Sequence, residues 1–479
     1  MPRPIEADFL AKPNITTHNM EISERYLLDT VEERKPPISA MTGSRRLVIG
    51  FALIIAVGTI LLRLPIASHV PGGVSWLDAL FTATSAVTVT GLSLFSVGTY
   101  YTIFGQLVIL LLLQIGGIGF IAISVVLYRI AGRHVGLQDR FILQQTLGVE
   151  KGTDLLRLTT YVLGMVLAIE FVGALFLFIR WAGTMSWGDA AYLAVFHAIS
   201  AFCNAGFDLF GGTQHEVFFG YGTDPWTLTV LAALISIGAL GLPVIDNLLQ
   251  WRPGRRLMLH TKLTLIITLI LTVVGMVLFF IDAHFADGVL KEMSFWERFW
   301  VGSFTVISSR TAGITIIPLD QIGEANQFII TVWMFIGGAP SSMAGGITTS
   351  TVIVLALAMR ATVAGEQQAV AFGRAMSKET IFKAISIMTV SILLVAILTL
   401  LMTLLQEGNL FDVAFEVISA FSNTGYSLGL TGNLSISGKL LIIFLMFWGR
   451  LGPLTLVVVL AQRQTPSLLT YPEEKVIMG

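Results

Sequence analysis

Charged residues are scarce in this chain. Asp, Glu, Lys and Arg make up 12% of its 479 residues, against about 25% in soluble proteins. Hydrophobic residues reach 54%, which excludes a disordered chain as well as a water-soluble fold. The formal net charge of −1 gives no basic balance for binding nucleic acid. We therefore expect a protein whose solvent is the lipid bilayer.

Cysteine is almost absent, since Cys203 is the single one. This excludes a disulfide framework and a cysteine-rich zinc or iron–sulfur site. The seven histidines show no H-E-x-x-H or similar ligand spacing. The sequence also shows no cluster of a nucleophile with a base. We therefore expect no metal-site catalysis and no enzyme.

The two ends of the chain are more polar than the rest. Residues 1–44 contain five prolines and an acidic stretch, with no apolar core after a basic start, so this segment is not a cleaved signal peptide. It predicts a cytoplasmic N-terminal tail. Residues 466–479 predict a cytoplasmic C-terminal tail.

Between these tails, apolar runs of about 20 residues, long enough to cross a bilayer, recur along the chain. We expect eight full spans, near residues 46–65, 101–128, 156–180, 226–250, 262–282, 327–359, 381–405 and 438–461. Shorter apolar segments, typical of re-entrant half-helices, lie near 76–87, 187–202, 295–309 and 410–421. The fold class is therefore an all-α membrane protein with a span, half-helix, loop, span unit that occurs four times.

Basic residues give the orientation, because cytoplasmic loops retain Lys and Arg. Most of the 29 basic residues lie in the N-terminal tail and in the linkers between the units. Both termini are therefore expected in the cytoplasm, and every half-helix is expected to enter the membrane from outside.

The four short segments resemble one another. Each begins with Ser or Asn and has an acid three residues later, as at a helix N-cap. Each ends in a glycine followed by a bulky residue, and these glycines recur at intervals of about 110 residues. The four starts are Ser75/Asp78, Ser186/Asp189, Ser294/Glu297 and Asn409/Asp412, and the four ends are Gly91–Leu92, Gly206–Phe207, Gly313–Ile314 and Gly425–Tyr426.

This pattern favours a cation site. A capped acid stabilises the N-terminal end of a short helix at the outer surface, and the partly negative C-terminal end then points into the membrane. Glycine permits positive φ and close approach of backbones, and irregular backbone at membrane depth persists only where it is buried in protein or lines a cavity. Four such segments about one axis can place backbone carbonyls in rings around a dehydrated monovalent cation. For a single glycine, tight helix packing is an equally simple explanation.

With these segments, the glycine-rich GGAPSSMAGGITTST from Gly337 and WGRLGPLTL from Trp448, the chain resembles the potassium-translocating subunits of the Trk/Ktr/HKT superfamily, most closely the Ktr type. The resemblance covers about residues 45–465. It implies a pseudo-fourfold pore within one chain, a homodimer in the lipid membrane, and a cytoplasmic ring of nucleotide-binding regulatory subunits.

By position, the resemblance assigns a selectivity filter whose main-chain oxygens bind potassium. Glycine stands at all four of its key positions, which in the family favours potassium over sodium, while a sodium requirement stays open. The filter residues so implied are Thr88, Val89, Thr90, Gly91, Cys203, Asn204, Ala205, Gly206, Arg310, Thr311, Ala312, Gly313, Ser422, Asn423, Thr424 and Gly425.

The sixth span is too long for a straight crossing. Residues 327–359 would measure about 50 Å as one helix, against a hydrocarbon core about 30 Å thick. A break is expected at the glycines in its middle, and the resemblance implies that this interruption is an intramembrane gate. A kinked packing helix is the alternative. The implied gate comprises Gly337, Gly338, Ala339, Pro340, Ser341, Ser342, Met343, Ala344, Gly345 and Gly346, together with Arg450. Within the gate, Met343 and Ala344 stand where the family usually has small residues, and Thr348 replaces a commonly seen lysine.

Two intramembrane charges need an explanation, because an unpaired charge is costly in lipid. Arg450 in the last span either faces the pore below the filter, where it opposes cations and holds the gating loop, or snorkels to the cytoplasmic edge. Glu170 is either a coupling acid or a hydrogen-bonding group between helices. His197 and Cys203 have packing or support roles as their simplest explanation.

Together these observations predict potassium uptake across the plasma membrane, without an organic cofactor in this chain. A secondary transporter for a small solute, with its site at the broken helix, is the alternative; carriers often use inverted repeats, whereas these units run in one direction. The predicted divisions are residues 1–44, 45–128, 129–250, 251–360, 361–465 and 466–479, that is, a tail, four pore repeats and a second tail.

Overall fold

The computed structural model describes residues 43–119, 155–211, 221–252, 256–285 and 288–452. The described residues are mostly helical, and their one sheet is an antiparallel pair of two-residue strands, β1 (Val370–Ala371) and β2 (Arg374–Ala375). The two predicted tails lie largely outside the described residues.

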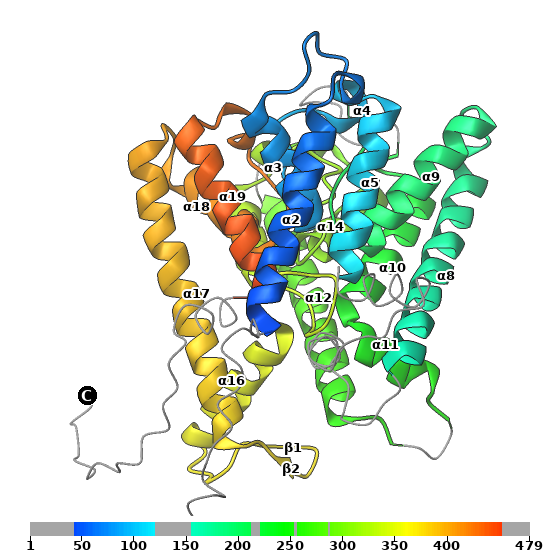
Figure 1. The fold of residues 1–479 in the computed structure, drawn as a ribbon. Helices are drawn as coiled ribbons and strands as arrows, with labels where there is room; N and C mark the ends of the chain where they lie inside the picture. Colours follow the sequence, from blue (N-terminus) through cyan, green and yellow to red (C-terminus); the bar gives the residue numbers. More distant parts are fainter. Residues whose placement is uncertain (1–42, 120–154, 212–220, 253–255, 286–287, 453–479) are drawn as a thin grey trace, which may run out of the picture. The chain divides into compact units, whose positions relative to one another are not determined.

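Four long helices match the predicted first span of each unit: α2 (Gly43–Arg63), α8 (Leu155–Trp181), α12 (Leu259–Phe285) and α17 (Lys378–Leu405) (Figure 1). Within the described residues, three helical segments are long and apolar enough to cross a bilayer, namely Thr160–Trp181, Leu259–His284 and Lys378–Leu405. A bent pair of helices raises this number to four.

Four shorter helices occupy the predicted half-helix positions: α3 (Trp76–Val87), α9 (Trp187–Phe202), α14 (Phe295–Ser309) and α18 (Leu410–Ser422). The predicted N-caps are confirmed, because each Ser or Asn side chain accepts a hydrogen bond from a backbone N–H of the first turn. A reciprocal capping box forms at Ser294 and Glu297. Hydrogen bonds from the Ser294 side chain and from its backbone N–H lower the pKa of the exposed Glu297 carboxyl.

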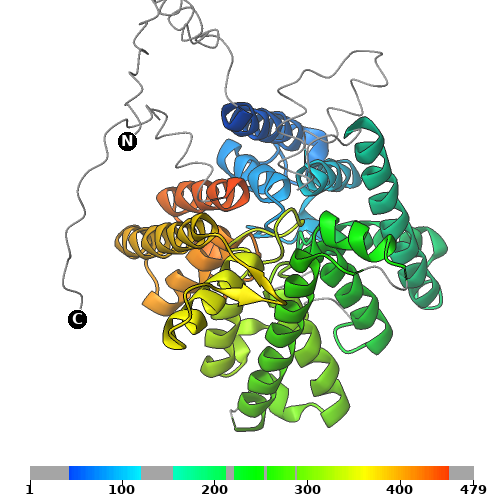
Figure 2. The ribbon, with the colours of Figure 1, turned by 90° about the horizontal axis from the view of Figure 1, so that it is seen from below.

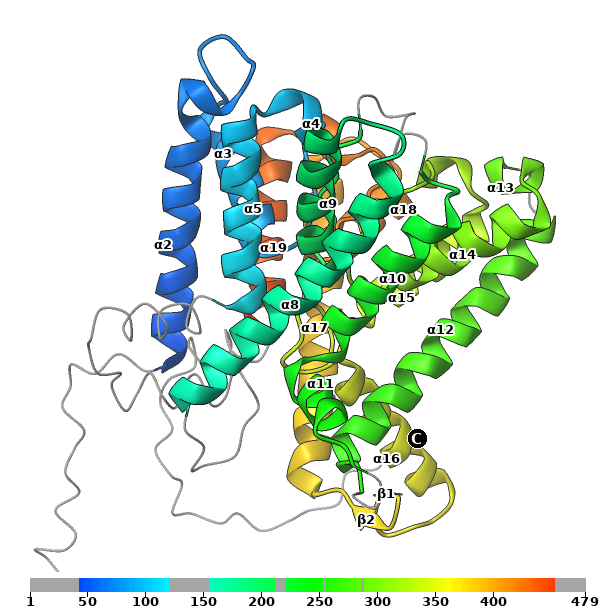
Figure 3. The same cartoon turned by 90° about the vertical axis from the view of Figure 1, so that its right-hand side faces the viewer.

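The predicted second spans are interrupted more often than the sequence suggested. The expected break in residues 327–359 is confirmed, since α15 (Glu324–Phe335) and α16 (Thr349–Val363) are separate helices. The span expected near 226–250 is not one continuous helix: α10 (Pro225–Leu240) ends before Gly241, and α11 (Leu242–Leu249) leaves it at 102° (Figure 3).

In the other two units, the corresponding helix also ends at a glycine with positive φ. Helix α5 (Ile103–Ile118) ends at Gly119 with φ +92°, and α19 (Ile436–Leu451) ends at Gly452 with φ +84°. Gly241 has φ +83°. A left-handed glycine after a helix ends it, because the next residue cannot continue the ladder of hydrogen bonds. The remainders of the predicted spans 101–128 and 438–461 lie largely outside the described residues.

The helices follow one another around a centre in chain order, as the sequence colours show in Figure 2. Each short helix packs against the long helix before it and the helix after it: α3 against α2 and α5, α9 against α8 and α10, α14 against α12 and α15, and α18 against α17 and α19. The units also meet in a closed circuit, since α5 contacts α9, α10 contacts α14, α15 contacts α18, and α19 contacts α3. The four short helices therefore surround one central region.

Short elements lie in the connections between the longer helices: η1 (Pro65–Ala67), α4 (Val97–Tyr100), α13 (Val289–Glu292), η2 (Leu319–Gln321) and η3 (Thr431–Asn433). The largest hydrophobic cluster spreads over the first three units and reaches Phe415 and Leu451. A second cluster packs α17, α18 and α19 around Phe81, Met402 and Phe421. Many large apolar side chains on α2, α8, α12 and α17 point outward and stay exposed, as expected for helices that face lipid.

The capping box at α14 gives a stability prediction. We expect Ser294→Ala to lower the free energy of unfolding by about 1 kcal/mol, because it leaves backbone donors at the helix start unpaired. Thermal unfolding of the detergent-solubilised protein measures this. Ser386→Ala is the control, since that hydroxyl bonds the carbonyl of Phe382 within α17. Equal melting temperatures for Ser294→Ala and Ser386→Ala would contradict the capping role of Ser294.

Candidate functional site

The chain reverses direction after each short helix at a glycine with positive φ. The values are +87° at Gly91, +70° at Gly206, +61° at Gly313 and +95° at Gly425. Residues with a side chain rarely adopt this conformation. The four predicted filter segments therefore share the glycine-dependent turn that the sequence pattern indicated.

The four turns touch one another in a closed ring. A Cβ added at any of these glycines would lie closer than 3.0 Å to the carbonyl oxygen that precedes the glycine of the neighbouring unit. The neighbours are Ala205 for Gly91, Ala312 for Gly206, Thr424 for Gly313, and Thr90 for Gly425. Backbones thus approach at distances that no side chain would permit, and they bring main-chain oxygens of all four units to one place.

Buried side chains cross-link the ring between units. Thr311 donates a hydrogen bond to Asn204 (Oγ1 to Oδ1, 2.7 Å). Asn423 donates to Thr90 (Nδ2 to Oγ1, 2.9 Å) and also to the carbonyl of Met446 in α19 (2.8 Å). These side chains are almost fully buried, so their bonds hold the backbone of adjacent units in register.

The third segment differs in its backbone. Val89, Asn204 and Asn423 adopt the left-handed conformation with φ between +52° and +59°, but Thr311 does not. Instead, the N–H groups of Ala312 and Gly313 both donate to the carbonyl of Ser308, at 2.9 and 3.0 Å. The fourfold likeness of the turns is therefore approximate.

A cavity of about 480 Å³ lies over the ring. All four filter glycines line it, together with the residue two positions after each of them: Ser93, Asp208, Thr315 and Ser427. Asp208 and Asp320 are the charged residues of its lining, which is therefore negative. Such a lining attracts cations to the glycine ring.

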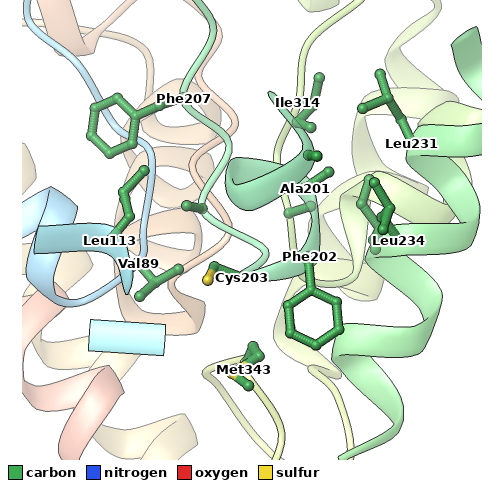
Figure 4. Packing of buried hydrophobic residues seen from close by; sticks show 14 of the residues in the cluster. Val89, Leu113, Ala201, Phe202, Cys203, Phe207, Leu231, Leu234, Ile314 and Met343 are labelled. Atoms are coloured by element: carbon green, nitrogen blue, oxygen red, sulfur yellow. The ribbon is translucent and has the colours of Figure 1, made fainter. Parts of the chain in front are cut away.

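The predicted gate lies on the other side of the ring. The loop between α15 and α16 bonds to the end of α10: Ala339 N–H donates to the carbonyl of Ala239 (2.9 Å), and Met343 N–H to that of Gly238 (3.2 Å). Gly345 and Gly346 pack against Asn423 and Ser422 of the fourth filter segment. Figure 4 shows Met343 beside Phe202 and Cys203 at the end of α9.

Arg450 holds this loop. Its Nη1 donates to the carbonyl of Met343 (2.5 Å), and its Nη2 donates to the carbonyls of Gly116 (2.5 Å) and Gly117 (3.3 Å) at the end of α5. The guanidinium thus joins the fourth unit, the loop and the first unit. Snorkelling to the cytoplasmic edge does not describe this geometry. Arg310, a predicted filter residue, also reaches the loop, with its Nη2 at 3.5 Å from the carbonyl of Gly337.

Glu170 lies behind the second filter segment and is 3% exposed. The amide of Gln114 donates to both carboxylate oxygens, at 3.1 and 2.9 Å, and the thiol of Cys203 lies 3.8 Å from one of them. The carboxylate therefore links α8, α5 and a filter residue. This arrangement satisfies the expectation of a hydrogen-bonding group between helices.

Several residues of the site were not singled out from the sequence. Gly116, Gly238 and Gly449 allow the second helices to approach the ends of the short helices, where an added Cβ would meet the carbonyls of Val87, Phe202 and Phe421. Each of these glycines lies shortly before the glycine that ends its helix. This shared position could have indicated them from the sequence. Glu416 lies in the short segment 410–421 and Asp208 follows Gly206 by two residues, but nothing in their spacing indicated their contacts.

The chain is similar to known transport proteins in both sequence and fold. The family model TrkH, described as cation transport protein, matches residues 17–468. The chain is 35% identical to Ktr system potassium uptake protein B of Bacillus subtilis, over 90% of this chain and 96% of that protein. It is 34% identical to the potassium/sodium uptake protein NtpJ of Enterococcus hirae, with the same two coverages. The crystal structure of the potassium transporter TrkH from Vibrio parahaemolyticus has the same fold, with a TM-score of 0.68 and 18% identity over 93% of this chain and 89% of that one.

Proposed function

Because the chain belongs to the TrkH family of cation transport proteins, we propose that it is a membrane protein that takes up potassium. The names of its relatives support this ion, since they are a potassium uptake protein and a potassium/sodium uptake protein, each at more than 30% identity over nearly the whole chain.

Potassium passes through the glycine ring, where main-chain oxygens replace its water. The observation that carries this proposal is the closed contact of four glycine turns, each against the carbonyl of the next, below a cavity that holds two carboxylates and no Lys or Arg in its described lining. The oxygens belong to the predicted filter segments 88–91, 203–206, 310–313 and 422–425. Membrane potential supplies the driving force, about 2.3 kcal/mol per elementary charge and 100 mV.

The architecture that serves this function consists of four span, pore-helix, span units within residues 45–465, with eight crossings in all. In each unit the helix that begins the second crossing (α5, α10, α15 or α19) is short, so few of the described helices reach the length of a full span. The protein resides in the plasma membrane, with both termini in the cytoplasm and the cavity side facing out.

The loop of residues 337–346 is the gate, and hydrogen bonds from Arg450 hold it closed. Support comes from the position of the loop against Ser422 and Asn423 and from the three carbonyls that the guanidinium holds. In this state the positive charge below the filter opposes the passage of a cation. Opening requires the loop to leave these contacts.

The chain works as a homodimer with a cytoplasmic ring of nucleotide-binding regulatory subunits. Relatives named as proteins of a Ktr system support a system with more than one component. A dependence on sodium is part of the proposal, in view of the relative named for both ions. The chain has no enzymatic activity of its own.

Complementation tests the function. The chain, expressed with a regulatory partner in a host that lacks its own potassium uptake, is expected to restore growth at low potassium. Purified protein in proteoliposomes is expected to carry a potassium current without any organic solute. Absence of both, with the chain correctly inserted, counts against the proposal, and a current that needs an organic solute supports a secondary transporter.

A further inference from the structure

Two of the short helices carry a buried ionisable side chain at the same place. His197 in α9 and Glu416 in α18 each lie six residues before the first residue of the predicted filter segment. Both side chains are 0% exposed. Because α9 and α18 belong to the second and fourth units of the ring, these two side chains lie in opposite units.

Both side chains bond to the chain just beyond the filter glycine. The Nε2 of His197 lies 2.9 Å from Oδ1 of Asp208, eleven residues further on. The hydroxyl of Ser427, again eleven residues further on, donates to Glu416 (Oγ to Oε2, 2.8 Å). The Thr431 hydroxyl donates to the other carboxylate oxygen of Glu416. We name these contacts the rim braces.

The residues that the rim braces hold line the outer cavity. Asp208 and Ser427 stand two positions after Gly206 and Gly425, and both contribute to its wall. Asp208 also accepts hydrogen bonds from the N–H groups of Phe210 (2.9 Å) and Gly211 (3.0 Å), so it organises the outgoing loop. Each rim brace therefore connects a short helix to the segment of chain that follows the filter glycine.

The other two units are held by tyrosine. Tyr101 donates to Thr82 in α3 (3.0 Å), and Tyr426 donates to the carbonyl of Ile314 next to the third glycine (3.2 Å). Neither contact joins an ionisable side chain of a short helix to the residue two positions beyond the glycine. The rim braces are thus a feature of two opposite units.

We propose that His197 and Glu416 are positioning residues that fix the outer rim of the ring and thereby set the discrimination between potassium and sodium. This inference rests on the proposed function. A ring of oxygens distinguishes the two ions only while the number and placing of its oxygens are maintained. A buried carboxylate that loses its donors is costly, so each intact brace resists displacement of the chain beyond the glycine.

The test at Glu416 separates its bonds from its charge. Glu416→Gln keeps oxygen and nitrogen atoms that can bond both hydroxyls, whereas Glu416→Leu has a similar volume and bonds neither. We expect the leucine variant to lose about tenfold in the ratio of apparent potassium to sodium affinity, as for one hydrogen bond to a charged group. The glutamine variant is expected to keep most of the parental ratio.

The matched control is Trp333→Phe. Trp333 is buried, and its Nε1 donates a hydrogen bond to the carbonyl of Leu271 (2.9 Å) between α15 and α12, in the third unit. We expect this variant to lose stability but to keep the parental ratio of affinities. His197→Phe, which fits among the rings of Trp181 and Phe210, is expected to lower the ratio as Glu416→Leu does.

The measurements are potassium and sodium competition for uptake, made on protein whose amount in the membrane is matched. A parental ratio of affinities in both Glu416→Leu and His197→Phe overturns the inference, and so does an equal loss in Trp333→Phe. A loss of the same size in Glu416→Gln also overturns it, because charge alone would then be responsible. Absence of potassium uptake in the parent chain would instead refute the proposed function.

Discussion

Gly91→Ser is expected to lower potassium uptake by tenfold or more and to remove most of the preference for potassium over sodium. Two costs combine at this residue. A side chain at φ +87° costs about 1–3 kcal/mol in backbone strain. Its Cβ would also meet the carbonyl of Ala205 and the Cα of Gly206 in the next unit, so the Ala205 carbonyl must move. Since about 1.4 kcal/mol corresponds to a tenfold change, a collision with backbone at the ring is sufficient for the expected loss.

Gly72→Ser is the matched control for this experiment. Gly72 has nearly the same backbone conformation, with φ +84°, but nothing lies within 4 Å of an added Cβ. Its substitution carries the strain without the collision, so uptake is expected to keep its ion preference. Uptake of radioactive rubidium with sodium as competitor gives both the rate of uptake and the preference for potassium over sodium. If the two serine variants behaved alike, the ring at Gly91 would not be the selective element.

Arg450→Gln is expected to raise potassium flux in the absence of the regulatory partner by about tenfold. The wild-type side chain holds Met343, Gly116 and Gly117 through their carbonyls, and hydrogen bonds from a charged donor contribute about 1.5–3 kcal/mol each. Removing them frees the loop from the ends of α5 and α19. It also removes a positive charge that opposes a cation below the filter.

Arg298→Gln is the control for the loss of an arginine that bonds carbonyls. Arg298 donates to the carbonyls of Ala283, Lys291 and Met293 near the start of α14, far from the loop in sequence. We expect no gain of flux from it. Measurements of potassium current on proteoliposomes that lack the regulatory partner distinguish the two variants. A fall in flux for Arg450→Gln at normal protein yield would mean that the arginine supports the open state.

The helices of this protein were predictable because their signals are local. Hydrophobic length and the Ser or Asn caps gave α9 and α14 with both ends correct. The bend between α10 and α11 was missed because residues 226–250 form one apolar run, and its interruption depends on Gly241 alone, which packs against the carbonyl of Pro340 in another unit. A glycine in a helix pattern indicates a break only when such a partner is known.

The candidate site was predictable to the level of the four glycines and the broken sixth span. Repetition gave their equivalence, and the positive φ that they share agrees with it. The order in which the turns touch, the carbonyls that Arg450 binds and the contacts of Glu416 depend on residues far apart in sequence. Such contacts have no periodic signal in one sequence, so they could not be predicted from it.

The closed ring also constrains how the protein is made. Gly425 packs against Thr90, and Asn423 bonds to the same residue, although 333 positions separate that bonded pair. The ribosome must therefore deliver the fourth unit before the first one finds its last neighbour. Until then the nascent chain holds a ring that is open on one side, with Thr90 lacking its bond from Asn423 at membrane depth. The ring can therefore close only after the last unit has been translated.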